Sequence, residues 1–216
     1  MSGERIIRLA VDINVFVTDI LSSRPQGRAS ASTRILEAVR EGRCPAGPVQ
    51  FVASLPMIEN FADVLRRRLG YGRSEADEKA WLLEQYALDG PMPSRPYVSV
   101  GSGYIPFETE ERLRAAAASH LRTENAGKLF NEVQDDRYVL ETALAGRADI
   151  LVTADIAGFR KGSAVRFTRD DVLLFPLADR ALVIGTPHFA SYWLFQGTVP
   201  DAALVASRPE EFVRLA

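Results

Sequence analysis

Strand-like and helix-like patterns alternate from the start of the chain, and this alternation limits the folds that the chain can adopt. The segment IIRLAVDINVFV reads as a first strand whose best apolar core is Ile6–Val11. A helical stripe at 31–42, a short strand at 49–54 and a second helix at 54–70 follow it. The β-α-β-α order predicts an α/β fold with a parallel sheet covered by helices.

The second helix carries its own boundary signals, because Ser54 can cap its first turn and Gly70 can close its end. The later helices are predicted at 74–88, 107–125, 135–146, 187–195 and 209–216, and the later strands at 148–155, 164–168, 172–175 and 181–187. We predict one domain over residues 1–216, with a helical and loop insertion at 71–128. The C-terminal tail at 187–216 is left unplaced.

Composition excludes several classes of protein. The chain has 216 residues, of which 47% are hydrophobic and 25% charged, as in a soluble globular protein. Its net charge of -2 excludes a polybasic protein, and its single cysteine, Cys44, excludes an internal disulfide and a cysteine-based zinc site. The N-terminal segment lacks the apolar core of a secretion signal, and no stretch approaches the ~20 apolar residues of a membrane span. We therefore expect a cytoplasmic protein without a membrane partner.

Carboxylates stand where strands and helices of this pattern begin or end. Asp12 follows the first strand core, and Asp155 ends the run ADILVTAD. Asp136 begins a helix whose apolar face turns toward the sheet, and Glu59 lies in the first turns of the second helix. Since parallel strands present their C-terminal ends at one edge, we predict that these four acids converge there.

Each acid also has a purely structural alternative. Asp12 and Asp155 could cap the turns after their strands, and Glu59 could be an exposed helix residue. Asp136 could stabilise the N-terminus of its helix through the helix dipole, and the adjacent Asp135 leaves its assignment ambiguous.

Crowded carboxylates repel one another, so a site with four of them needs a proton or a cation. Carboxylate and water oxygens suit Mg²⁺ or Mn²⁺. Two such ions ~3.5–4 Å apart would activate water and stabilise the leaving oxygen of a phosphodiester. The acids therefore indicate hydrolysis of a phosphoryl group.

Three blocks of the sequence resemble the PIN-domain family, the ribonuclease domain of many toxins of toxin–antitoxin pairs. The blocks are RLAVDINVFV, SLPMIENFADVLRR and DDRYVLETALAGRADILVTAD. The first contains the family's Asp-x-Asn as Asp12 to Asn14, and the last contains its Thr-x-Asp as Thr153 to Asp155. The likeness covers about residues 5–70 and 130–186, and IAGFRKG after Asp155 lacks the further acid that many members have.

This resemblance implies a three-layer α/β/α sandwich with a central parallel sheet. It also implies cleavage of RNA with Mg²⁺ or Mn²⁺ held by the four acids, with Asn14 and Thr153 as supporting groups that orient the acids or a water. The toxin-like ribonucleases of the family would add an antitoxin protein as a partner.

A nuclease must hold a polyanion beside its acids. The run Arg66–Arg68 and a second group that includes Arg160 and Lys161 could contact phosphates, and we take Arg66, Arg67, Arg160 and Lys161 as candidate RNA-binding residues. The alternative for the run is a solvated helix end. A homodimer is a further expectation, from apolar residues that the tail could expose at Phe189, Trp193 and Phe195.

Two other enzyme classes fit less well. A haloacid-dehalogenase-like phosphatase needs an Asp where Asn14 stands, and no Gly-x-Gly-x-x-Gly follows the first strand as in a dinucleotide-binding protein. The alternative that stays open is a catalytically silent PIN-like module that binds RNA or a protein.

Overall fold

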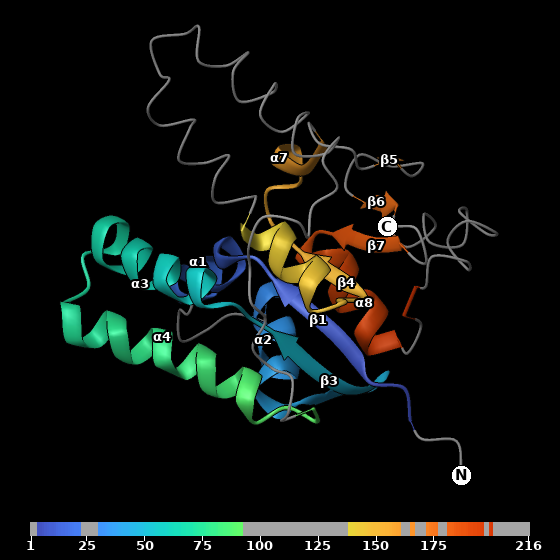
Figure 1. Cartoon of the computed structure of the whole chain (residues 1–216), viewed down its shortest axis with the longest axis horizontal. Coiled ribbons are helices and arrows are strands. Elements are labelled where there is room, and N and C mark those ends of the chain that lie inside the picture. The colour runs from blue at the N-terminus through green and yellow to red at the C-terminus, as the bar shows by residue number, and fades with distance from the viewer. Residues whose placement is uncertain are drawn as a thin grey trace, which may run out of the picture.

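The computed structural model describes residues 4–22, 30–92, 138–160, 165–166, 172–176, 181–196 and 199–200, and the statements below concern these residues. Within these ranges seven strands form one sheet in the order β2-β3-β1-β4-β7-β6-β5. The strands are β1 (Ile7–Val11), β2 (Arg43–Cys44), β3 (Gly47–Val52), β4 (Ile150–Val152), β5 (Val165–Arg166), β6 (Val172–Pro176) and β7 (Ala181–Gly185). Figure 1 shows this sheet at the centre of the molecule.

The centre of the sheet is parallel and its edges are antiparallel. Strands β3, β1, β4 and β7 run in the same direction, whereas β2 pairs antiparallel with β3. At the other edge β6 pairs antiparallel with β7, and β5 with β6. The predicted α/β class and parallel centre are confirmed, and the antiparallel edges are an addition that the strand pattern did not reveal.

Helices cover both faces of the sheet. Those with bounds within the described residues are α1 (Ile13–Ser22), α2 (Ala31–Glu41), α3 (Leu55–Leu69), α4 (Arg73–Leu88), α7 (Ile156–Arg160) and α8 (Pro187–Gln196), and residues 138–145 are also helical. In Figure 1 the yellow helix of residues 138–145 lies in front of the sheet, while α2 and α8 lie behind it. This arrangement is the three-layer sandwich that the family resemblance implied.

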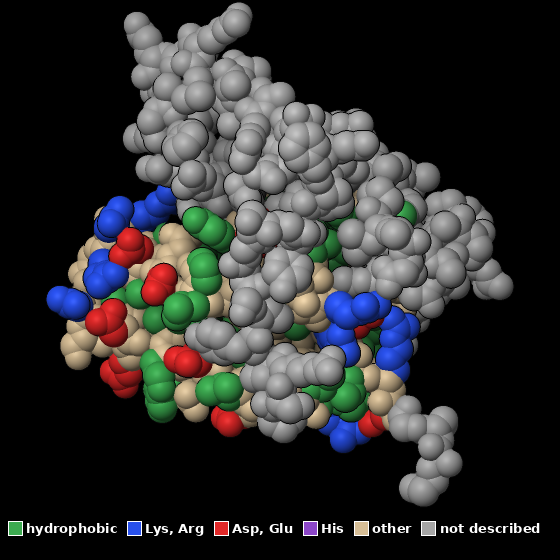
Figure 2. Space-filling model, in the orientation of Figure 1, with side chains coloured by type: hydrophobic (Ala, Val, Ile, Leu, Met, Phe, Trp, Pro, Cys, Tyr) green, Lys and Arg blue, Asp and Glu red, His purple; other side chains and the backbone are tan. Residues whose placement is uncertain are grey.

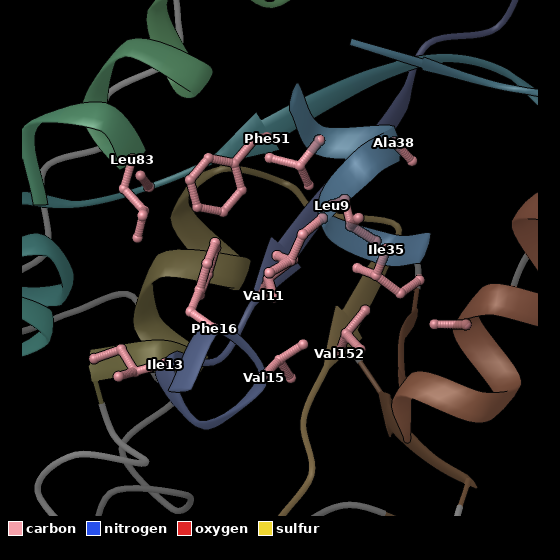
Figure 3. Packing of buried hydrophobic residues seen from close by; sticks show 14 of the residues in the cluster. Leu9, Val11, Ile13, Val15, Phe16, Ile35, Ala38, Phe51, Leu83 and Val152 are labelled. Carbon is pink, nitrogen blue, oxygen red and sulfur yellow. The ribbon is translucent and has the colours of Figure 1, made fainter. Parts of the chain in front are cut away.

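Side chains alternate between two cores along the central strands, as the pleat of a strand requires. Leu9 and Val11 of β1 enter the larger core, which also receives apolar residues from α1, α2, α3, α4 and α8. Ala10 enters a second core, formed with the helix of residues 138–145 and α7. Figure 3 shows part of the larger core, where Phe16 of α1 lies edge-on to Phe51 of β3 with ring centroids 5.8 Å apart.

The first strand is shorter than the sequence pattern predicted. It ends at Val11, and α1 begins at Ile13, so the prediction that IIRLAVDINVFV is one strand was wrong. The residues after Asp12 have high β propensity, but Val15 and Phe16 are buried against the larger core as parts of a helix. Tertiary packing overrides a local preference of this size.

Ser54 stands at the N-cap of α3 but does not cap it with its side chain. Its hydroxyl lies 2.6 Å from the Thr142 hydroxyl, in the helix on the opposite face of the sheet. The predicted cap position is thus confirmed and the predicted hydrogen bond is wrong. Gly70 ends α3 in the left-handed conformation, with φ 72°, as glycine permits.

Two segments outside the recognised blocks contribute to the larger core. Helix α4, which lies within the predicted insertion, buries Ala76, Ala80, Leu83 and Ala87. Helix α8, which lies within the predicted tail, buries Phe189 and Trp193, so the idea that these two aromatics are exposed was wrong. The homodimer itself stays a prediction.

In the described part of the chain, no helix has the length and apolar character that a membrane span requires.

Gly146 allows the helix of residues 138–145 to approach β3 closely. A Cβ added there would lie 1.9 Å from Val52 Cγ1 and 3.1 Å from the Thr142 carbonyl oxygen. We expect Gly146→Ala to lower the free energy of unfolding by about 1–3 kcal/mol, measured by urea denaturation. Gly72→Ala is the control, because nothing lies within 4 Å of an added Cβ there. Equal stability of the two variants would contradict the close approach.

Candidate active site

The site lies where the two central strands of the sheet end. Val11 of β1 pairs with Val152 of β4, so the next residues, Asp12 and Thr153, leave the sheet side by side. The Asp12 amide donates to the Val152 carbonyl oxygen at 2.8 Å, which extends the pairing by one residue. The chain then turns into α1 directly after Asp12 (Figure 1). Ligands bind at this edge of a parallel sheet, next to the point where connections leave in opposite directions.

Asp12 is 7% exposed, and both of its carboxylate oxygens accept hydrogen bonds. Its Oδ2 accepts from the Asn14 side-chain amide at 2.7 Å and from the Thr153 hydroxyl at 2.6 Å. Its Oδ1 accepts from the Asn14 backbone amide at 3.4 Å. Oδ2 therefore accepts two short hydrogen bonds, and the one that Oδ1 accepts from Asn14 is longer.

Asn14 and Thr153 also fix the loop that follows β4. The Asn14 side-chain oxygen accepts from the Ala154 amide at 2.9 Å. The Thr153 hydroxyl oxygen accepts from the Asp155 amide at 3.0 Å and from the Asn14 side-chain amide at 3.2 Å. This network connects the β1–α1 turn to the loop that carries the exposed Asp155.

Burial raises the pKa of Asp12 from its ordinary value of 3.8 to about 6, because a charged carboxylate loses its hydration there. The hydrogen bonds from Thr153 and Asn14 act in the opposite direction, since they favour the charged form. The negative charge of Asp155 acts in the same direction as burial, and the pKa of about 6 is the net result of these effects. The two carboxylates are thus close enough to repel each other, and a cation between them would relieve this repulsion.

A cleft of about 310 Å³ opens in front of these residues. Its described lining comes from the β1–α1 turn, α1, α3, the helix of residues 138–145 and the loop after β4. The lining residues are Asp12, Ile13, Asn14, Val17, Thr18, Asn60, Val64, Arg68, Val139 and Asp155. The described part of the lining therefore combines two carboxylates, one cation and an apolar wall.

Of the four predicted acids, the structure brings Asp12 and Asp155 into one cleft. Asp136 and its neighbour Asp135 lie outside the described residues. Glu59 is exposed on α3 and does not line the cleft, whereas the next residue, Asn60, does. The metal-binding roles of Glu59 and Asp136 stay predictions.

The predicted RNA-binding residues take different positions. Arg66 and Arg67 lie on α3 outside the cleft lining, and both form ion pairs with Asp63. Arg160 is the last residue of α7, and Lys161 lies outside the described residues. Among the described residues, the basic one that lines the cleft is Arg68, which the sequence analysis did not single out within its run.

Sequence reasoning also missed Asn60 and the apolar wall. A signal for them existed, because Asn60, Val64 and Arg68 follow one another at intervals of four and so share one side of α3. The apolar stripe of α3 turns toward the core, and this row lies at its margin. Only the positions of α1 and of the helix at 138–145 show that the row faces a cleft.

A family model of the PIN domain matches residues 8–157 of the chain. The protein belongs to the PIN-domain family. The match spans the predicted blocks and α4, which places α4 within the family's domain. PIN domains are in general nucleases, and they typically use divalent metal ions. A search of curated proteins found no match to this chain.

The carboxylates of this PIN domain fit a hydrated divalent cation. Among the described residues no group of three or more His, Cys, Asp or Glu side chains could hold a metal ion. Mg²⁺ is nevertheless commonly bound by one or two carboxylates together with waters and substrate phosphates. Asp12 and Asp155 supply such a pair, and the cleft between them leaves room for waters and a phosphate.

The buried Asp12 makes stability depend on pH in the absence of metal. Its folded pKa of about 6 exceeds 3.8, so its stabilising contribution is complete below pH 3.8 and is lost as the pH rises through 6. We expect the unfolding free energy of the parent, relative to Asp12→Asn, to fall by about 2 kcal/mol between pH 4 and pH 7. Urea denaturation in EDTA measures this difference, and parallel pH profiles would contradict the raised pKa.

The Thr153 hydroxyl lowers the pKa of Asp12, because it donates to the charged carboxylate. We expect Thr153→Val to raise the pKa of Asp12 above about 6, measured by carboxyl NMR titration without metal. Thr18→Val is the control, since the Thr18 hydroxyl donates to the Asn14 carbonyl oxygen and not to Asp12. A pKa that does not move in Thr153→Val would show that this hydrogen bond is not made in solution.

Proposed function

We propose that this protein is a metal-dependent endoribonuclease that hydrolyses phosphodiester bonds of RNA. The observation that carries the proposal is the pair Asp12 and Asp155 in one cleft at the ends of adjacent parallel strands. Membership of a family that consists in general of nucleases supports it.

Asp12 and Asp155 would hold the metal ion, Mg²⁺ or Mn²⁺. Such an ion, when bound, lowers the pKa of an attacking water and neutralises charge at the scissile phosphate. The hydrogen bonds from Asn14 and Thr153 position the Asp12 carboxylate and favour its charged form. Oδ1 of Asp12, whose hydrogen bond from the Asn14 backbone amide is long at 3.4 Å, is the oxygen better placed to bind a ligand.

The lining of the cleft supports a single strand as the substrate. Three valines, Val17, Val64 and Val139, come from three different helices and form an apolar wall beside the acids. Such a wall can cover the face of a sugar or base while the phosphate lies against the carboxylates. The cleft volume of about 310 Å³ is at the lower end of ligand sites, which suits a short segment of one strand better than a duplex.

Cleavage of a fluorescent single-stranded RNA in Mg²⁺ or Mn²⁺ tests the proposal. We expect cleavage by the parent to stop in EDTA, and Asp12→Asn or Asp155→Asn to lower the rate by at least about a hundredfold. Changes in groups that merely orient metal ligands already cost about 10- to 100-fold. Asp63→Asn is the matched control, because Asp63 pairs with arginines of α3 outside the cleft lining. Cleavage by Asp12→Asn at the parent rate would contradict the mechanism.

The silent-module alternative predicts a different result in a binding experiment. Isothermal titration of the parent with Mn²⁺ should show binding that Asp12→Asn removes if the cleft is a metal site. Absence of such binding, together with retained affinity for RNA or a protein, would favour the silent module.

Three further predictions extend beyond the described cleft. Glu59→Gln decides whether the exposed carboxylate beside Asn60 contributes to cleavage, and Asp136→Asn decides the same for the predicted helix start. The role as a toxin with an antitoxin partner also stays a prediction.

A further inference from the structure

Helix α3 presents one cation to the cleft. Asn60, Val64 and Arg68 are spaced four residues apart, and all three line the cleft. Arg68 stands in the last turn of the helix, at the end of this row. Arg68 therefore lines the same cleft as Asp12 and Asp155.

The neighbouring arginines are engaged elsewhere. Arg67 pairs with Asp63 at 3.1 Å, and Arg66 pairs with Asp63 and lies 3.7 Å from Asp77. Figure 2 shows the result at the end of the molecule formed by α3 and α4, where basic and acidic side chains alternate on the surface. In the described part of the chain Arg68 has no such ion pair, although its side chain is exposed.

A cation that lies in the same cleft as two acids, but makes no ion pair with them, is placed to bind an anionic ligand. We propose that Arg68 forms a phosphate subsite of the cleft and contacts a backbone phosphate of bound RNA beside the carboxylates. The inference rests on the proposed function for its ligand, and it assigns the contact to one residue of the Arg66–Arg68 run.

The chemistry of arginine suits this role. The planar guanidinium group can donate two parallel hydrogen bonds to phosphate oxygens, which fixes the direction as well as the position of the phosphate. A phosphate held there would bring the strand toward Asp12 and Asp155 without reading its bases. The effect of losing Arg68 should therefore be the same for RNAs of different sequence.

Fluorescence anisotropy with oligouridine and oligoadenosine in EDTA tests the subsite without cleavage. We expect Arg68→Gln to weaken binding of both RNAs by about 10- to 100-fold, the usual range for a lost hydrogen bond to a charged group. The slope of log affinity against log salt concentration should fall in magnitude by about 0.7, as for one phosphate of a single strand. Arg68→Lys keeps the charge but not the paired donors, so it should bind with intermediate affinity.

Arg73→Gln is the matched control. Arg73 lies in the first turn of α4, its side chain is 86% exposed, and its partner is Asp77 at 3.8 Å. It removes the same charge from the same end of the molecule without touching the cleft lining. We expect its RNA affinity and salt slope to match those of the parent, and thermal denaturation checks that both variants are folded.

The outcomes separate this inference from the proposed function. Selective loss of RNA binding in Arg68→Gln supports the subsite even if the parent cleaves no RNA, in which case only the nuclease proposal fails. Cleavage by the parent with parent-like binding by Arg68→Gln overturns the subsite and leaves the nuclease proposal intact. Equal losses in Arg68→Gln and Arg73→Gln, or no RNA binding by the parent, also overturn the subsite.

Discussion

The parallel pairing of β1 with β4 is the constraint on which the site depends. The two strands, Ile7–Val11 and Ile150–Val152, lie far apart in the sequence, and their register alone places Asp12 beside Thr153. The hydrogen bond of 2.6 Å between these two side chains is a direct result of that register. A shift of one residue would move every side chain of β4 to the opposite face of the sheet. It would remove this hydrogen bond and exchange the β4 side chains between the two cores.

The hydrogen bonds around Asp12 reduce the free-energy cost of burying its carboxylate. A buried, ionised carboxylate without partners would cost several kcal/mol. Asn14 and Thr153 offset part of this cost, but the pKa stays raised because burial and the negative charge of Asp155 outweigh them. The site therefore keeps an excess of negative charge that a bound cation would neutralise. In an α/β domain with an otherwise ordinary core, this excess is the clearest sign of function.

The sequence predicted the central strands and the helices α2, α3, α4 and α8. For α2 and α3 the reason is a strong apolar periodicity, together with a glycine at the end of each helix. The prediction failed at α1, where β-branched residues continue past Asp12 and the strand pattern could not be told from a buried helix. It failed at Ser54 for a different reason. A hydroxyl at an N-cap can accept a hydrogen bond from a backbone amide of its own helix, and the sequence shows that local partner. The Ser54 hydroxyl instead pairs with the Thr142 hydroxyl, 88 residues away, and the sequence does not show that contact.

The site, like the fold, could be predicted from the sequence only in part. The order of Asp12, Asn14, Thr153 and Asp155 was readable from the sequence, because strand ends and their polar residues are local features, and it indicated a cation-binding edge and the PIN-domain family. Only the tertiary structure decided which side chains of α3 share the cleft. A helix presents a new side chain every 100°, so Glu59 and Asn60, or Arg67 and Arg68, differ little in sequence but point in different directions. The choice between them depends on how α3 is rotated against the core, and packing sets that rotation.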